Sequence, residues 1–304
     1  MKALRIYEYG GALQMEEVDQ PTAGPGQVVV RNMATSLNPI DPRAASGAMK
    51  QVFPLEFPRI PGGDISGTVE SVGEGVSQFK AGDEVFGFSA AGGAYAEFVA
   101  VDAGAICIRP VELSVAQGAA VAVVVQTAMQ ALALAKVGPG QNVLIHAGSG
   151  GVGSLAIQLA HQQGAHVITT ARAEHKEALL ALGADRVIDF TTERFEEAME
   201  LLDAVLDLVG GETLARSYAL IKHGGILVTA NQPPDAKECE KHGIQGFMVQ
   251  TKVTAEGLQE FAKLVEEGKI TPLVAEVETL WEPEMIWAKR PPAKAVGKIV
   301  FTVD

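Results

Sequence analysis

The sequence predicts an α/β protein in which a β-rich first third precedes a doubly wound parallel sheet. Two observations lead to this fold class. Over the first hundred residues, short β-branched runs alternate with glycine- and proline-rich turns. From about residue 112 onward, apolar strands alternate with helical stretches, which is typical of a parallel sheet with helices on both faces. The 304 residues suffice for two ordinary domains.

The N-terminal strands are expected to be short. Runs 27–30 and 67–72 are rich in β-branched residues, and turn signals such as Pro61-Gly62-Gly63 separate them. Closely spaced strands of this kind predict a sheet that closes into a barrel or a sandwich.

A long apolar stretch, 118–135, follows. It carries Gln126, Thr127 and Gln130 and ends at Lys136, so it predicts a buried helix rather than a membrane span. The alternating pattern then predicts, in order, strand 142–147, helix 151–163, strand 166–171, helix 176–182, strand 187–190, a strand ending at 206–209, helix 212–222 and strand 226–230. The tail adds an amphipathic helix, 256–267, and a closing strand, 297–301.

Charge and cysteine content exclude several function classes. The net charge of -13 and the pI near 5.0 make nucleic acid and anionic membranes poor partners. Two cysteines, Cys107 and Cys239, cannot form a disulfide framework or a cysteine-rich zinc lobe. Reduced thiols and an N-terminus without an apolar signal-peptide core predict a cytoplasmic protein.

The strongest motif is a G-x-G-x-x-G loop, formed by Gly148, Gly150 and Gly153, between the strand at 142–147 and an apolar helix. In a dinucleotide site the first glycine allows the tight turn, the second lets pyrophosphate approach the backbone, and the third lets helix and strand pack closely. A glycine-rich turn without a ligand is the alternative. The expected pyrophosphate-binding residues are Gly148, Ser149, Gly150, Gly151, Val152 and Gly153.

The residues after the next strand favour NADPH over NADH. Strand 166–171 is followed by Arg172 and not by the carboxylate that accepts hydrogen bonds from the ribose of NADH. Arg172 is suited to stack on adenine and to pair with a 2′-phosphate, with His175 and Lys176 adding positive charge. For His175 and Lys176 the alternative is a solvated helix position. Glu174 is the dissenting residue, because its carboxylate would suit NADH.

The chain resembles the medium-chain dehydrogenase/reductase superfamily, specifically its zinc-free quinone oxidoreductase-like branch. The resemblance runs over nearly the whole chain, and five motifs in the family's order carry it. They are Asn38-Pro39-Ile40-Asp41, Ile60-Pro61-Gly62-Gly63-Asp64-Ile65-Ser66-Gly67, Lys80-Ala81-Gly82-Asp83-Glu84-Val85, the loop at 147–153 and Gly297-Lys298-Ile299-Val300.

The resemblance implies a GroES-like β-barrel catalytic domain from residues 1–112 and 251–304, and a Rossmann NADP(H)-binding domain from residues 113–250. The cofactor would lie in the cleft between them. The resemblance also places Ala230, Phe247 and Lys298 at the cofactor, and it implies a homodimer. The paired prolines within 287–294 depart from the family's pattern, so the resemblance does not predict the far wall of the substrate pocket.

The resemblance further implies that no catalytic zinc is present. The family's zinc enzymes hold the metal with Cys, His and Cys. The first of these positions matches Asn38, the turn that carries the histidine matches Gly62-Gly63-Asp64, and the last falls around Val125-Gln126-Thr127, so no cysteine or histidine stands at any of them. Without a Lewis acid an alkoxide has no stabilising partner, so reduction of a quinone or an α,β-unsaturated carbonyl by hydride is favoured over alcohol oxidation. Asn38 would orient substrate and nicotinamide ribose, and Thr127 or the cofactor ribose hydroxyl is a second donor. Asp41 is expected to support the turn after Pro39, and Asp64 has a similar supporting role; a direct role in the reaction is the alternative for both.

Two other functions stay open from the sequence. One is a non-catalytic NADPH-binding sensor or crystallin-like protein with a closed pocket. The other is a metal-dependent alcohol dehydrogenase, in spite of the missing soft ligands.

Overall fold

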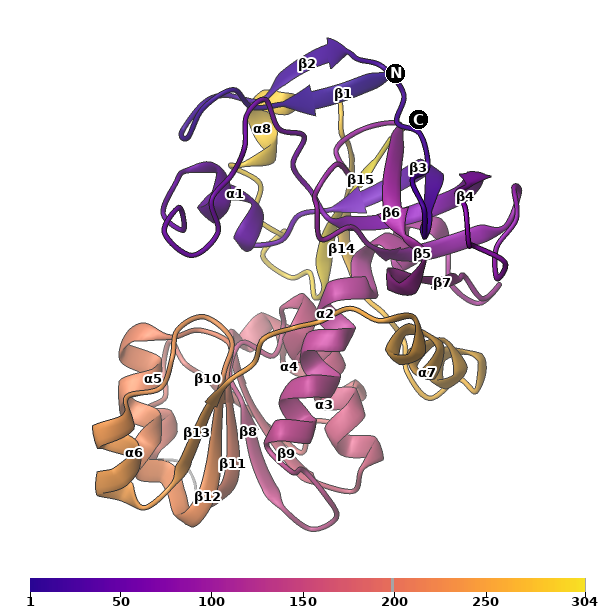
Figure 1. Ribbon diagram of the computed structural model, residues 1–304. Coiled ribbons are helices and arrows are strands. Elements are labelled where there is room, and N and C mark those ends of the chain that lie inside the picture. The colour runs from indigo at the N-terminus through magenta and orange to yellow at the C-terminus, as the bar shows by residue number, and fades with distance from the viewer. Residues whose placement is uncertain (198–199, 304) are drawn as a thin grey trace.

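The computed structural model describes residues 1–197 and 200–303, and two large sheets organise them, one above the other in Figure 1. Strands from both ends of the chain, drawn in indigo, purple and yellow, build the upper sheet. The middle of the chain, drawn in pink and orange, builds the lower sheet. We call the part that contains strands β1–β7, β14 and β15 the upper lobe, and the part that contains strands β8–β13 the lower lobe.

The upper lobe contains a mixed sheet of seven strands. Six of them follow the order β14-β15-β3-β4-β5-β7, and β6 pairs with residues 27–31 at the beginning of β3. Only β14 and β15 pair in parallel, and a separate antiparallel hairpin, β1–β2, lies beside this sheet. The strands are β1 (Lys2–Arg5), β2 (Gln14–Glu17), β3 (Gln27–Ser36), β4 (Asp64–Val72), β5 (Glu84–Phe88), β6 (Phe98–Asp102), β7 (Ile106–Ile108), β14 (Val274–Thr279) and β15 (Lys298–Thr302).

The lower sheet is entirely parallel. Its order is β10-β9-β8-β11-β12-β13, which is 3-2-1-4-5-6 when these strands are counted along the chain, so the doubly wound prediction is confirmed. The strands are β8 (Asn142–Ile145), β9 (His166–Ala171), β10 (Arg186–Asp189), β11 (Leu202–Asp207), β12 (Ile221–Thr229) and β13 (Gln245–Met248).

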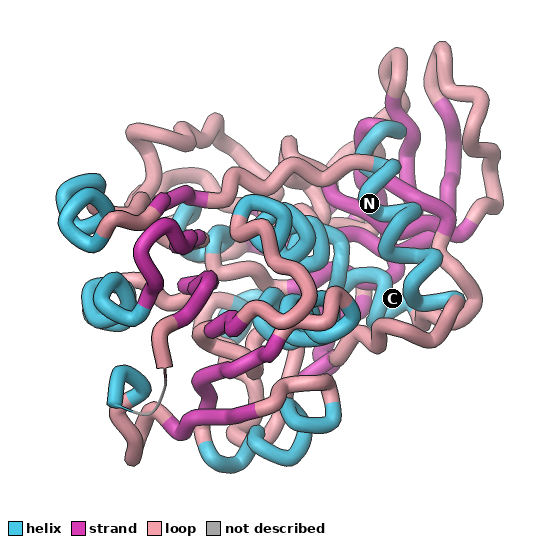
Figure 2. The backbone as a smooth tube through the Cα atoms, turned by 90° about the horizontal axis from the view of Figure 1, so that it is seen from below, coloured by secondary structure: helices cyan, strands magenta, loops and turns pink. Residues whose placement is uncertain are grey.

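Helices cover both faces of the lower sheet because successive residues of each strand point to opposite sides. Val143 and Ile145 of β8 face the core that includes α2 and α3, whereas Leu144 faces the core with α5 and α6. In Figure 2 helices flank the strands on both sides. The α-helices are α1 (Ile40–Ala45), α2 (Val115–Leu134), α3 (Gly151–Gln162), α4 (Lys176–Ala181), α5 (Gly211–Ser217), α6 (Ala236–His242), α7 (Ala255–Glu266) and α8 (Pro283–Ile286), and short 3-10 turns lie at Ala103–Ala105, Ala173–His175, Phe195–Glu197 and Tyr218–Leu220.

Helix α2 connects the two lobes (Figure 1). It begins at a capping box in which Ser114 and Gln117 satisfy each other's backbone amides. By length and composition alone it is apolar enough to cross a membrane, but 67% of the apolar window is buried inside the protein. This agrees with the prediction of a buried helix over 118–135.

Two neighbouring predicted elements are wrong in their bounds by several residues. The helix expected over 212–222 ends at Ser217, and β12 begins at Ile221 instead of 226. Ile221 pairs with Leu202, yet the next pair joins Ile226 to Ala204, so the intervening residues bulge out of the sheet. Gly224 lies in this bulge at a φ of +82°, a conformation that favours glycine.

Two strands carry little sequence signal because both lie at sheet edges. β13 closes one edge of the lower sheet and β14 one edge of the upper sheet. Their residues are mostly half-buried or exposed, so neither has the continuous apolar run of a central strand.

Candidate active site

The glycine loop lies where the strand order of the lower sheet reverses, between β8 and α3. This switch point is where open parallel sheets bind their ligands. A Cβ on Gly148 would lie 2.1 Å from the Thr169 hydroxyl, and one on Gly153 would lie 2.3 Å from the Ala147 carbonyl oxygen. At Gly150, by contrast, a Cβ would meet only that carbonyl, at 3.5 Å. Gly148 and Gly153 therefore allow close packing within the loop, whereas the space beside Gly150 leaves its backbone accessible.

The N-terminus of α3 fits an anionic group. The first amides of an α-helix have no partner within the helix, and Gly150 at the N-cap has no side chain to satisfy them. Together with the helix dipole, these amides form a binding site for phosphate. The donor set and the narrow cradle therefore suit the pyrophosphate of a dinucleotide.

A buried histidine supports the loop from behind. His146 is fully buried, and its Nδ1 and Nε2 atoms lie 3.0 Å from the hydroxyl oxygens of Thr170 and Ser217. Because the Ser217 hydroxyl donates to the Thr213 carbonyl, it accepts from Nε2–H, and Thr170 donates to Nδ1. Thr170 in turn accepts from the amide of Ala147, whose φ is +57°. His146 thus joins β8, β9 and α5 at the start of the loop.

In the upper lobe, Asn38 is held between a cation and an anion. Its Oδ1 accepts from Lys298 Nζ at 2.6 Å, and its Nδ2 donates to Asp64 Oδ2 at 2.6 Å. A lysine only donates and a carboxylate only accepts, so the amide has one orientation. All three side chains are buried, with Asn38 only 4% exposed. Within residues 1–197 and 200–303, the second N–H of this amide has no acceptor.

Asp64 has further hydrogen-bond partners in two other elements. Its Oδ2 also accepts from the Ser36 hydroxyl at 2.7 Å, and its Oδ1 accepts from the Val123 amide of α2 at 3.1 Å. Lys298 Nζ lies 4.0 Å from Oδ2. Burial lowers the pKa of Lys298, and the nearby Asp64 and Asp41 oppose that shift. Ser36 was not among the expected site residues; its only sequence signal is a polar residue at the buried end of an apolar strand.

Asp41 lies behind Asn38. Its carboxylate accepts from the backbone amide of Asn38 at 2.8 Å and from the Tyr95 hydroxyl at 3.4 Å. Burial raises the pKa of Asp41 to about 7, with the Asn38 amide and Lys298 opposing the shift. The bonded amide precedes Pro39, whereas the sequence suggested an amide after it. Asp41 therefore contacts the backbone of Asn38 and not its side-chain amide.

Thr127 has partners of its own. Its hydroxyl donates to the Val123 carbonyl, one helical turn earlier, at 2.7 Å, and accepts from the Thr251 hydroxyl at 2.8 Å. The hydroxyl proton is therefore already donated within α2 in this arrangement.

The residues expected at the ribose lie together after β9. Arg172 is exposed and stacks over the Phe190 ring, with its guanidinium carbon 5.8 Å from the ring centroid. His175 is buried, and both of its ring nitrogens lack a hydrogen-bond partner in the part of the chain that the structure describes. It is therefore not a solvated helix residue. Lys176 is exposed at the start of α4.

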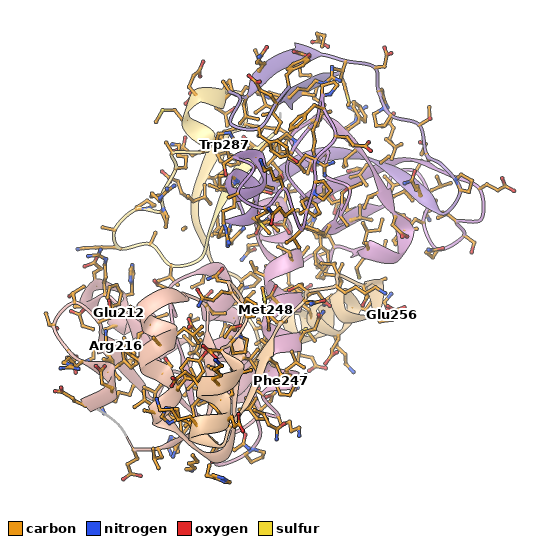
Figure 3. All side chains as sticks on the ribbon, turned by 60° about the vertical axis from the view of Figure 1, so that its left-hand side comes forward. Glu212, Arg216, Phe247, Met248, Glu256 and Trp287 are labelled. Carbon is orange, nitrogen blue, oxygen red and sulfur yellow. The ribbon has the colours of Figure 1, made fainter. Side chains whose placement is uncertain are left out.

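Ala230 and Phe247 flank the carboxyl ends of β12 and β13. The Ala230 amide donates to the Asp207 carbonyl at 3.0 Å, which continues the sheet past β12. Phe247 packs against the main core, and Figure 3 labels it with Met248 on the ribbon of β13. Both residues therefore lie at the carboxyl-terminal end of the parallel strands, as the glycine loop after β8 does.

In the ranges 1–197 and 200–303, no three His, Cys, Asp or Glu side chains gather as a metal site would require. Cys107 and Cys239 are both buried free thiols, one on a strand of the upper lobe and the other on a helix of the lower lobe. Burial raises the pKa of Cys107 to about 11, which keeps it a thiol.

A parallel sheet with this strand order and a glycine loop at its switch point defines a dinucleotide-binding protein. Comparison with known proteins agrees. Residues 24–112 match the family "Alcohol dehydrogenase GroES-like domain", and residues 151–262 match the family "Zinc-binding dehydrogenase".

Full-length relatives extend this match. The chain is 33% identical to the chloroplast envelope quinone oxidoreductase homolog of Arabidopsis thaliana, covering 99% of this chain and 98% of that protein. It is 33% identical to the chloroplastic NADPH-dependent alkenal/one oxidoreductase of Arabidopsis thaliana, covering 90% and 72%. Escherichia coli quinone oxidoreductase, solved in complex with NADPH, superimposes with a TM-score of 0.86 at 26% identity, covering 99% of this chain and 100% of that one.

The chain therefore belongs to the medium-chain dehydrogenase/reductase superfamily, in its quinone oxidoreductase-like branch. It is an oxidoreductase that uses a nicotinamide cofactor, and its two lobes are the GroES-like and Rossmann-type folds that the sequence predicts.

We predict that His146 makes the fold sensitive to acid. Burial lowers its pKa from 6.5 to about 3, with a smaller contribution from Arg216. Between these values the unfolded chain binds a proton that the folded protein does not, so stability falls as pH falls through this window. In wild type the free energy of unfolding should drop by at most about 1.4 kcal/mol per pH unit more than in His146→Phe.

Denaturant unfolding of both proteins across that pH range measures the difference in slope, with the exposed His223→Asn as control. Equal slopes for wild type and His146→Phe would contradict the assignment of a neutral buried imidazole.

Proposed function

We propose that this protein reduces a quinone or an α,β-unsaturated carbonyl with NADPH, by hydride transfer and without zinc. The observation that carries the proposal is the Asn38 amide, which Lys298 and Asp64 fix as a hydrogen-bond donor at the position where zinc enzymes of the family hold a soft metal ligand. The names of the two quinone oxidoreductase relatives and of the alkenal/one oxidoreductase support both substrate classes.

When bound, NADPH supplies the hydride. The α3 N-terminus would hold its pyrophosphate, and the second N–H of Asn38 would donate to the carbonyl oxygen of the acceptor or to the nicotinamide ribose. This fixed N–H would stabilise negative charge on the acceptor oxygen without reorganising. Asp41 keeps the Asn38 backbone in place, and Thr127 shapes the wall of the site through its bond to Val123. Water supplies the final proton.

The preference for NADPH rests on the residues after β9. The Arg172 guanidinium is exposed and lies over the Phe190 ring, where its N–H groups could pair with a 2′-phosphate. His175 contributes ring nitrogens that have no partner among the described residues, and Lys176 adds charge from the start of α4. Ala230 and Phe247 would line the nicotinamide end.

We further propose the assignment of the lobes. Residues 1–112 and 251–304 would act as the catalytic domain, and residues 113–250 as the NADP(H)-binding domain. The protein would act on a small molecule as a cytoplasmic homodimer. It would have no nucleic acid or membrane partner, which the net charge of -13 supports. The competing function is a non-catalytic NADPH-binding protein, which would bind the cofactor and turn over no acceptor.

Asn38→Ala tests the proposed donor. Loss of one fixed donor to a developing oxyanion should lower kcat with a quinone or an enone about 100-fold, while the Kd for NADPH stays within about threefold. Steady-state NADPH consumption and fluorescence titration measure the two quantities. Ser36→Ala is the matched control, because it removes another donor to the same Asp64 oxygen. An unchanged kcat in Asn38→Ala would contradict the proposal. So would a wild-type protein that binds NADPH but does not oxidise it with any quinone or enone.

Arg172→Ala tests the choice of cofactor. Removing a charge-assisted pair with the 2′-phosphate should raise the Kd for NADPH about tenfold or more and leave that for NADH within about twofold. Titration of both cofactors measures this, with the exposed Lys237→Ala as control. Equal weakening of NADPH and NADH would show that Arg172 does not read the 2′-phosphate.

A further inference from the structure

Strand β15 belongs to the upper sheet, yet its beginning touches the glycine loop of the lower lobe. The Gly297 amide donates to the Ser149 carbonyl at 2.9 Å, and Gly297 forms a parallel bridge with Gly150. Gly297 has a φ of +111°, and a Cβ there would lie 2.0 Å from the Leu273 carbonyl oxygen. In Figure 1 this yellow segment reaches down to the boundary between the lobes. The backbone therefore has little freedom at this junction.

The next residue, Lys298, extends the contact by its side chain. A Cβ on Gly151 would lie 2.7 Å from both Cγ and Cδ of Lys298, so the lysine stem crosses the space that Gly151 leaves open. The stem ends at Nζ, which donates to the Leu37 carbonyl and to Asn38 Oδ1. Lys298 is 6% exposed. One side chain thus touches the loop that would hold pyrophosphate and the amide that would face the substrate.

The ammonium decides which way the Asn38 amide points. A flipped amide would set its NH2 group against the Lys298 ammonium and its oxygen against the Asp64 carboxylate, which is unfavourable on both sides. Without the ammonium, Asn38 Oδ1 would lose its charged donor, and only the bond from Nδ2 to Asp64 would still orient the amide.

We propose that Lys298 is a positioning residue that couples the glycine loop to the Asn38 amide, so that the seating of the cofactor on the loop also sets the hydrogen-bond donor for the acceptor. This inference rests on the proposed function. It gives Lys298 a role in turnover that differs from a simple attraction for cofactor phosphate, because the ammonium is engaged by Leu37 and Asn38.

Lys298→Met keeps the length of the stem and removes the ammonium. We expect kcat with a quinone to fall about tenfold or more, because a misplaced donor costs rate, while the Kd for NADPH stays within about threefold. Lys298→Gln, which can still donate to Asn38 Oδ1, should recover part of the lost kcat. Thr302→Ala, near the other end of β15 and outside the site, is the matched control and should keep wild-type kcat and melting temperature.

Gly151→Ala pushes on the Lys298 stem from the side of the loop and provides the second arm of a double-mutant cycle. If Lys298 transmits the effect, Gly151→Ala lowers kcat in the wild-type background and lowers it little further in Lys298→Met. The inference would be overturned if the kcat losses of the two single variants multiplied in the double variant. It would also be overturned if Lys298→Met raised the Kd for NADPH and left kcat unchanged. In both cases wild-type turnover would still support the proposed function. Absence of wild-type turnover with quinones and enones would overturn both.

Discussion

Three buried side chains from distant parts of the chain, Lys298, Asn38 and Asp64, form one row of alternating charge and polarity. The amide lies 2.6 Å from each neighbour, and burial would make either charge costly if it stood alone. The row therefore holds only when β3, β4 and β15 lie side by side, as they do in the upper sheet. Its chemical consequence is an asparagine that presents a donor in one direction.

The lower lobe prepares the other half of the site by backbone geometry. Its glycine loop has no room for side chains at Gly148 and Gly153, and His146 fixes the residue that begins the loop through Thr170. In the proposed function the two halves act together, since the loop would bind an anion and the upper lobe orients an amide. The bond between Gly297 and Ser149 brings the two halves to a fixed separation.

Local pattern predicted most of the fold. Strand β9 has the expected bounds because an apolar, β-branched run lies between two clear turns, whereas β12 begins early because Gly224 permits a bulge that periodicity does not reveal. The glycine loop and Asn38 were likewise accessible as motifs. The bond from Lys298 to Asn38 was not, because it joins residues 260 positions apart. The partners of Thr127 were hidden for the same reason, since Thr251 lies far along the chain.

The central claim is direct hydride transfer at an amide-lined site that needs no metal. The measurement that tests it most directly uses chelator-treated protein, NADPH deuterated at both C4 positions of the nicotinamide, and an enone as acceptor. The account predicts one deuterium on the β-carbon of the product and a rate that the chelator leaves unchanged. Product without deuterium, or activity that disappears with the chelator and returns with zinc, would contradict it.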